Sequence, residues 1–298
     1  MTLKSYSPLT PLLLKSPHLG LTFIALLLAP LSQATNVRIQ TALGDIDIEL
    51  FDSAAPKTVA NFLAYAQSGA YIDSFFHRSV PGFIIQGGGY TLISNNSAKK
   101  IEALPPIPNE FSASRSNLRG TLSMAKIAGN PNSATNEWFI NIADNSANLD
   151  NQNGGFTVFG QVIGNSMAIV DAIAALPIYP GGGAFNTLPI TKTDTTNGLT
   201  QEHFVLVKSV SIIDTASEMI EADRIFNYME ASFPQFLMPA NAHSDSYSGF
   251  YFRYYPDTGA YIGRANNLIF YLGPLFDGKL TALASVKEAL TMAAAAGF

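Results

Sequence analysis

Short apolar runs separated by turn-forming residues limit the fold of this chain more than any other feature. The runs cover residues 82–86, 120–125, 138–142, 156–160 and 203–212. Most are too short for a typical helix, and Gly, Asn or Pro residues lie between them. Because few helical patterns interrupt the series, the sequence favours an antiparallel barrel over a sheet in which strands and helices alternate.

The first part of this β-rich region predicts a hairpin. Residues 37–41 and residues 46–50 each alternate apolar and polar side chains, and Leu43-Gly44-Asp45 stands between the two segments. A period of two places the apolar side chains of both strands on one face. We therefore expect a two-stranded ribbon with one buried face at this position.

Two helices are expected in the same region. One begins at Pro56, carries apolar residues at helical spacing on one face and ends at Gly69. The other covers residues 166–176 and ends before Pro177. The Gly-, Thr- and Pro-rich segment 178–200 predicts a long surface loop.

The first 34 residues have the organisation of a signal peptide. Lys4 and Lys15 supply positive charge, residues 19–28 form an apolar run, and Ser32-Gln33-Ala34 offers small residues at the cleavage positions. A buried helix is the alternative. We expect cleavage near Ala34 and a periplasmic or secreted protein, with no membrane-spanning segment in the mature chain because no apolar stretch reaches 18 residues.

Composition excludes several classes of protein. The formal charge of −5 gives no electrostatic support for a nucleic-acid partner. The absence of cysteine excludes disulfides, thiolate catalysis and cysteine-based zinc sites. The four histidines lack metal-ligand spacing, so no metal is expected. The run Gly87-Gly88-Gly89 lacks the glycine pattern of a dinucleotide-binding loop, and we expect no cofactor.

Composition changes near residue 215, and residues 216–298 are interpreted as a separate α+β module. Residues 217–236 form an amphipathic pattern that predicts a helix. Two aromatic-rich runs follow, with a turn at residues 256–259, and they predict a β-hairpin. The aromatic side chains fit either a carbohydrate or cell-wall platform or, more commonly, the core and cross-strand pairs of a small sheet. A partner of this module is possible but is not identified by its sequence.

Four ordered motifs identify the larger part of the chain as similar to cyclophilins. Residues 76–89 (FHRSVPGFIIQGGG) closely resemble the signature segment of that family. Residues 118–125, 136–141 and 158–160 match its later motifs in order and spacing. The resemblance covers residues 37–213. It implies a mainly β fold for residues 35–215, with a closed antiparallel eight-stranded barrel capped by two helices, and peptidyl-prolyl cis/trans isomerase activity on proline-containing polypeptides.

The implied reaction requires no nucleophile and no proton transfer. Rotation about a peptide bond faces a barrier of about 18–20 kcal/mol because the C–N bond has partial double-bond character. Two features of a site lower this rotation barrier: an apolar pocket that fixes the proline ring and a donor that stabilises the twisted state. The resemblance assigns the donor to Arg78, whose guanidinium stays charged and presents a rigid fork of N–H groups.

The resemblance also implies which residues bind the substrate. Phe83, Ile84, Phe139, Leu149 and Phe156 stand where the family forms the proline pocket. Each of these apolar residues, taken alone, is more typical of a core. The remaining predicted contacts to the substrate chain come from Gln86 and from the backbone at Ala125 and Lys126.

Two residues depart from the family pattern in ways that affect function. Glu137 replaces a usual glutamine and is included among the substrate-binding residues. Its charge either attracts Arg78 away from the prolyl nitrogen or orients it, and from the sequence we expect the first, so that Glu137→Gln raises kcat/KM. Asn148 stands where drug-sensitive members carry tryptophan, so cyclosporin is expected to bind weakly.

The sequence favours an isomerase that assists the folding of exported proteins. Two alternatives remain open. One is a chaperone or scaffold that binds proline-containing segments with little turnover. The other is an assembly or wall-binding protein that acts through residues 216–298.

Overall fold

A computed structural model describes residues 34–95, 97–247 and 249–298. The expected signal peptide therefore lies outside the described residues, except for Ala34. Residues 34–298 form one compact unit. In the part of the chain that is described, every helix is too short or too polar to span a bilayer.

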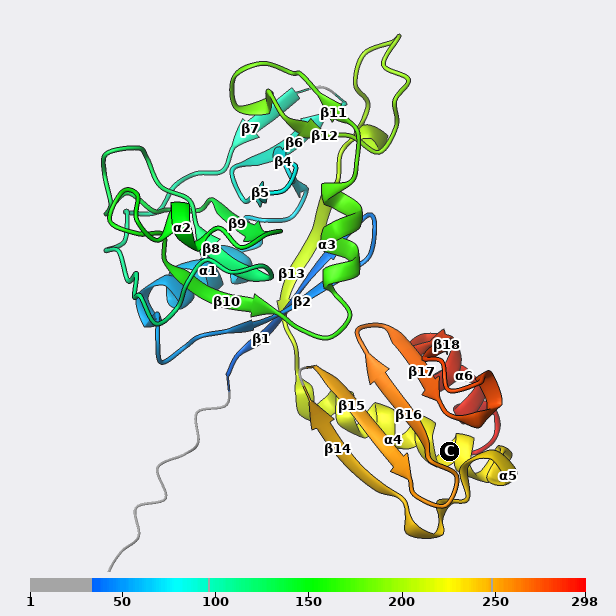
Figure 1. Cartoon of the computed structure of the whole chain (residues 1–298). Coiled ribbons are helices and arrows are strands. Elements are labelled where there is room, and N and C mark those ends of the chain that lie inside the picture. Colours follow the sequence, from blue (N-terminus) through cyan, green and yellow to red (C-terminus); the bar gives the residue numbers. More distant parts are fainter. Residues whose placement is uncertain (1–33, 96, 248) are drawn as a thin grey trace, which may run out of the picture. The chain divides into compact units, whose positions relative to one another are not determined.

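The larger sheet contains eleven strands among the described residues, in the order β4-β5-β9-β8-β10-β2-β1-β13-β3-β6-β7. Figure 1 labels most of these strands. The strands are β1 (Asn36–Thr41), β2 (Asp45–Leu50), β3 (Ser74–Phe75), β4 (Arg78–Val80), β5 (Ile84–Gly87), β6 (Tyr90–Ser94), β7 (Ser97–Lys100), β8 (Thr121–Met124), β9 (Trp138–Asn141), β10 (Val158–Val162) and β13 (Leu206–Ile212). All pairs are antiparallel, and β1 and β2 form the expected hairpin.

The connection between β3 and β4 closes this sheet into a barrel. The two strands stand far apart in the strand order but are separated in the chain only by Phe76 and His77. The sheet must therefore curve until its β4 edge meets β3. When β3 and β4 count as one interrupted strand and the β6–β7 hairpin is set aside, eight of the described strands surround the barrel, which confirms the fold expected from the sequence.

Two helices pack against the barrel core, as predicted. Helix α1 (Pro56–Gln67) begins with proline, whose missing N–H costs nothing in the first turn, and it buries Val59 and Phe62 on one face. Helix α3 (Met167–Ala174) buries Val170 and Ile173. A further single turn, α2 (Ser146–Leu149), lies in the loop after β9.

Trp138 explains the glycine run after β5. Its indole is fully buried, and the rings of Phe62, Tyr71 and Phe76 meet it edge-on. Gly88 has a φ of +77°, and a Cβ there would lie 2.5 Å from the carbonyl oxygen of Asn136. The glycines thus allow close packing between β5 and β9.

The segment predicted to be a long loop contains additional structure. Strand β11 (Ile178–Tyr179) pairs with β12 (Leu188–Pro189), and a short 3-10 helix covers Gly183–Phe185. A second 3-10 helix, Gln201–His203, follows the segment. Leu188 and Ile190 are buried against Phe75 and Phe204. The loop prediction was wrong here because a few apolar residues within a Gly- and Thr-rich segment provide an anchor to the barrel.

The C-terminal residues form more structure than the predicted helix and hairpin. Helix α4 (Thr215–Ser232) ends two residues before Pro234, and a single turn, α5 (Pro234–Leu237), follows. The expected continuous helix is interrupted because proline has no N–H to donate within a helix. Two short 3-10 helices cover Pro239–Asn241 and Pro274–Phe276.

A second antiparallel sheet follows α4 and α5, with the strand order β14-β15-β16-β17-β18. Its strands are β14 (His243–Tyr247), β15 (Phe250–Tyr255), β16 (Ala260–Ala265), β17 (Leu268–Leu272) and β18 (Thr281–Ser285). Helix α6 (Val286–Ala295) comes last. The sheet is larger than the predicted hairpin because β17, which carries Phe270 and Tyr271, and β18, which has no aromatic residue, add two strands to it.

The aromatic side chains of this second sheet divide between its two faces. Tyr255 and Tyr271 are buried with residues of α4 and α6, so they belong to the core. Tyr254 and Tyr261 pair across strands with ring centroids 4.5 Å apart. Core packing and cross-strand pairing therefore account for these four rings.

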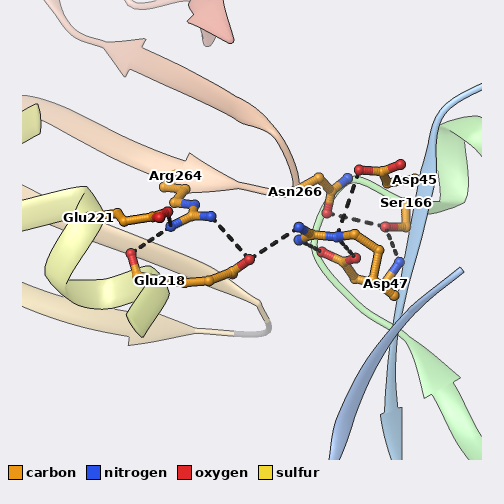
Figure 2. Close-up of polar contacts among 8 residues, drawn as sticks. Asp45, Asp47, Ser166, Glu218, Glu221, Arg264 and Asn266 are labelled. Carbon is orange, nitrogen blue, oxygen red and sulfur yellow. Dashed lines mark hydrogen bonds and ion pairs between the residues drawn. The ribbon is translucent and has the colours of Figure 1, made fainter. Parts of the chain in front are cut away.

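Charged side chains from β1, β2, α4 and β16 form the cluster drawn in Figure 2. Arg264 is buried and contacts Glu218 and Glu221 at 3.0 and 3.1 Å. Glu218 also lies 3.1 Å from Arg38, which donates to both carboxylate oxygens of Asp47. Carboxylates thus neutralise two guanidinium groups that are largely removed from water.

Candidate active site

A cavity of about 350 Å³ opens on the barrel and brings the predicted site residues together. This volume lies in the range of roughly 300–1,000 Å³ that is typical of small-molecule pockets. All the predicted residues line it except Glu137, and two further polar residues join them. The lining consists of Arg78, Phe83, Ile84, Gln86, Ala125, Lys126, Phe139, Asn148, Leu149, Gln152 and Phe156.

The apolar side of the cavity is a small core of its own. Ile84 on β5, Phe139 on β9 and Leu149 on α2 are each less than a tenth exposed. The ring of Phe156 meets the ring of Phe139 edge-on at 5.9 Å, and Phe83 packs beside them. This arrangement provides the dry surface that a proline ring requires.

The polar side of the cavity is provided by a cross-strand pair. Arg78 on β4 stands directly opposite Gln86 on β5, and Nη1 of Arg78 donates to Oε1 of Gln86 at 3.2 Å. Burial lowers the pKa of Arg78, but a guanidinium remains charged at any physiological pH. Within the described part of the chain, Arg78 forms no ion pair. Its other N–H groups are therefore available to a ligand in the cavity.

Glu137 lies behind this pair and not beside Arg78. Its Oε2 accepts a hydrogen bond from Nε2 of Gln86 at 2.7 Å and lies 3.4 Å from Nε2 of His77. The direct attraction of Arg78 expected from the sequence is not formed, because the Gln86 amide stands between the two charges. Among the predicted site residues, Glu137 alone does not line the cavity.

The segment Ala125–Lys126 contributes both backbone and side chain. The N–H of Ala125 donates to the carbonyl of Glu137, which leaves the Ala125 carbonyl and the Lys126 N–H for a substrate strand. From the sequence, Lys126 is expected to act through its backbone, but its side chain also makes contacts. It donates to the carbonyls of Asn153 and Gly155, and its ammonium lies 4.7 Å from the centre of the Phe156 ring.

The family comparison agrees with this geometry. Residues 36–195, more than half of the 298 residues, match the family described as cyclophilin type peptidyl-prolyl cis-trans isomerase/CLD. The chain belongs to the cyclophilin family. It is a peptidyl-prolyl cis-trans isomerase, and the matched region contains every residue that lines the cavity.

Bacterial cyclophilins are among its relatives. The chain is 44% identical over 144 residues to a peptidyl-prolyl cis-trans isomerase of Acinetobacter baylyi, covering 48% of this chain and 73% of the relative. It is 42% identical over 141 residues to isomerase B of Escherichia coli, covering 46% and 82%. A solved cyclophilin of Cryptosporidium parvum is 25% identical, with a TM-score of 0.45 over 61% of this chain and 98% of the other.

Buried asparagines support the cavity of this cyclophilin and were missed in the sequence. Asn117 donates to the carbonyl of Phe156 and to Asp150, and its own oxygen accepts from Asn141. Asn145 donates to the carbonyl of Phe83. These amides thus fix two loops that carry pocket residues. Their position inside or next to the family motifs was the only signal, since a lone asparagine in a loop is usually a turn residue.

The chemistry of this cyclophilin site needs only the side chains already described. Among residues 34–95, 97–247 and 249–298, no group of three His, Cys, Asp or Glu side chains is arranged to hold a metal ion. The cavity offers two cations (Arg78 and Lys126), three side-chain amides (Gln86, Asn148 and Gln152) and an apolar wall. Such a set can bind a proline ring and donate hydrogen bonds to the adjoining peptide.

Proposed function

We propose that this cyclophilin isomerises X-Pro bonds in exported proteins, in the periplasm or outside the cell, after removal of residues 1–34. The signal-peptide pattern at residues 1–34 supports this substrate class, because an enzyme carried across the membrane meets polypeptides that fold there. Prolyl isomerisation takes tens to hundreds of seconds without a catalyst and limits the folding of many chains.

Arg78 acts in this proposal as the donor that stabilises the twisted peptide. Its free N–H groups face the cavity, and the prolyl nitrogen regains a lone pair as the C–N bond loses its double-bond character. A hydrogen bond to that lone pair forms only in the transition state, so it raises kcat more than it improves substrate binding. The absence of a described carboxylate partner for Arg78 favours turnover over simple retention of proline-containing segments.

The remaining residues of the cavity position the substrate. The proline ring packs against Phe139, Leu149 and Phe156, which exclude water and so strengthen the hydrogen bond from Arg78. The free carbonyl of Ala125 and the free N–H of Lys126 are the backbone groups that an extended substrate strand would meet. The bound chain is then held on both sides of the bond that rotates.

The location is tested by the N-terminus of the protein in its native host. Protein recovered from the periplasm or the medium should begin at or close to Thr35. The same sample should accelerate the refolding of a proline-limited exported protein. A full-length chain that begins at Met1 and remains in the cytoplasmic fraction would contradict the export proposal without affecting the assignment as an isomerase.

A further inference from the structure

Four side chains form a continuous line of contacts that starts in the cavity and ends in the barrel core. Arg78 on β4 donates to Gln86 on β5, Gln86 donates to Glu137 immediately before β9, and Glu137 faces His77 between β3 and β4. The distances are 3.2, 2.7 and 3.4 Å. His77 is almost fully buried, so the inner end of this line is fixed by the core.

The donor and acceptor properties of these groups allow only one orientation of the Gln86 amide. A guanidinium has donors only, and an ionised carboxylate has acceptors only. Gln86 must therefore direct its NH₂ group toward Glu137 and its carbonyl oxygen toward Arg78. In a rotated amide, the NH₂ group would face the N–H donors of Arg78, and the carbonyl oxygen would face the carboxylate acceptors of Glu137. Both hydrogen bonds would then be lost.

We propose that Glu137 is a positioning residue for catalysis: it fixes the orientation of the Gln86 amide, and Gln86 in turn holds the Arg78 guanidinium toward the bound peptide. The inference rests on the proposed role of Arg78 as the donor to the prolyl nitrogen. The sequence left two roles for Glu137, attraction of Arg78 away from the prolyl nitrogen or orientation of Arg78. The inference selects orientation, which Glu137 exerts through Gln86.

The surroundings of Glu137 keep it charged and in place. Burial acts to raise the pKa of Glu137, but His77, Gln86 and Lys100 outweigh this effect and hold that pKa below its usual range. Tyr90 is the other titratable group near it, and burial together with the charge of Glu137 raises the Tyr90 pKa. The carboxylate is thus ionised at neutral pH and cannot donate a proton to the amide.

The absence of a side chain at residue 89 makes room for this carboxylate. A Cβ on Gly89 would lie 3.0 Å from Cδ of Glu137 and 3.1 Å from Cε1 of His77. Both contacts are tighter than ordinary van der Waals separation. The close approach of Glu137 to His77 therefore depends on glycine at this position.

Glutamine at residue 137 would remove the constraint while preserving the shape. A neutral amide can accept from Gln86 or donate to it, so both orientations of the Gln86 amide would become possible. In one of them an NH₂ group faces Arg78, and the guanidinium loses its acceptor. The unrotated orientation still keeps both hydrogen bonds, but rotation now costs only the bond to Arg78, and the bond to residue 137 is weaker without its charge. Gln86 would therefore hold Arg78 in the active position for a smaller fraction of the time.

The first measurement compares the full-length Glu137→Gln variant with the parent in a prolyl isomerisation assay. We expect kcat to fall about three- to tenfold, with KM changed less than about twofold, because the lost constraint acts on the transition-state donor. Glu102→Gln removes one exposed carboxylate of the same region and should match the parent. An unchanged or higher kcat in Glu137→Gln, with the melting temperature preserved, would overturn the proposal.

A double-mutant comparison separates this role from a general structural one. In a Gln86→Ala background there is no amide to orient, so adding Glu137→Gln should change kcat no further. Additive losses would show that Glu137 acts by another route. The pH profile gives a third check: kcat of the parent should fall as pH drops through the lowered pKa of Glu137, and this step should be absent in Glu137→Gln.

Arg78→Ala distinguishes failure of this inference from failure of the proposed function. If Arg78→Ala is as active as the parent, the catalytic role of Arg78 is wrong, and the positioning of Arg78 by Gln86 and Glu137 cannot affect catalysis. If Arg78→Ala is severely impaired while Glu137→Gln equals the parent, Arg78 keeps its role and the orientation of Gln86 by Glu137 is rejected.

Discussion

Replacement of Lys126 should weaken substrate binding in a manner that depends on pH. The ammonium of Lys126 donates to the carbonyls of Asn153 and Gly155, at 2.9 and 2.6 Å, and lies over the ring of Phe156. These contacts fix the loop that carries Phe156, one wall of the proline pocket. Lys126→Met keeps most of the apolar stem but removes the charge and the donors.

The expected magnitude follows from these contacts. A hydrogen bond from a charged donor contributes about 1.5–3 kcal/mol when shielded, and a cation–π contact about 0.5–1 kcal/mol at an exposed site. Lys126 is only partly buried, so we take the total effect on the loop to be about 1 kcal/mol. Phe156 contacts the proline ring in both the ground state and the transition state. Lys126→Met should therefore raise KM about fivefold, with little change in kcat.

The pH dependence gives a sharper result. Burial lowers the pKa of Lys126 to about 8, while the two carbonyls and the ring favour the charged form. As pH rises through this value the ammonium loses its proton, and the clamp on the loop weakens. KM of the parent should rise between pH 7 and pH 9, with a midpoint near 8.

Two variants control this assay. Lys126→Met should show a high KM at every pH, and Lys126→Arg should show a flat, low KM because a guanidinium stays charged. Unfolding would not produce the effect. The folded pKa of Lys126 lies below its ordinary value, so at pH values between these two the unfolded chain binds more protons than the folded chain. In that range this group makes the free energy of unfolding rise with pH, so a loss of folded protein cannot explain a rise in KM. A flat KM in the parent, or an equal rise in Lys126→Arg, would refute the reasoning.

Two further outcomes are expected from the same cavity. Asn148 lines the cavity but lacks the broad apolar face and the indole N–H of a tryptophan. Asn148→Trp should therefore tighten cyclosporin binding at least about tenfold in a titration. Nanomolar binding by the parent would argue against our alignment of this loop. Asn117→Ala leaves several buried hydrogen-bonding partners unsatisfied. It should reduce the free energy of unfolding, measured by urea titration, by about 2–4 kcal/mol. A loss below about 0.5 kcal/mol would show that water replaces the amide.

Most of the predicted pocket residues lie within continuous motifs, whereas Lys126, Leu149 and Phe156 lie outside them and were assigned through the family resemblance. Arg78 and Gln86 stand in one segment, and the β4–β5 hairpin makes them partners by local register alone. Phe139 joins them through the pairing of β5 with β9, which the family resemblance implied and which periodicity could not show. Short-range pattern and family spacing therefore determined both the barrel and its lining.

What the sequence could not provide were contacts that depend on the exact direction of polar side chains. A carboxylate at residue 137 could attract or orient Arg78, and only the position of the Gln86 amide between them distinguishes the two. The same holds for Lys126, whose carbonyl acceptors come from a separate loop. In the C-terminal part, β17 has a strand-like sequence but its pairing partners could not be read from it, and β18 has no strong local pattern.

The most direct test of the whole account is the activity of Arg78→Ala on an X-Pro peptide. We expect kcat/KM to fall by about 10²–10³, equivalent to about 3–4 kcal/mol of transition-state stabilisation, because the donor to the prolyl nitrogen is lost. The melting temperature should change little, since Arg78 forms one side-chain hydrogen bond among the described contacts and no ion pair. A variant that isomerises the peptide as fast as the parent would contradict the central claim that Arg78 drives catalysis in this cyclophilin.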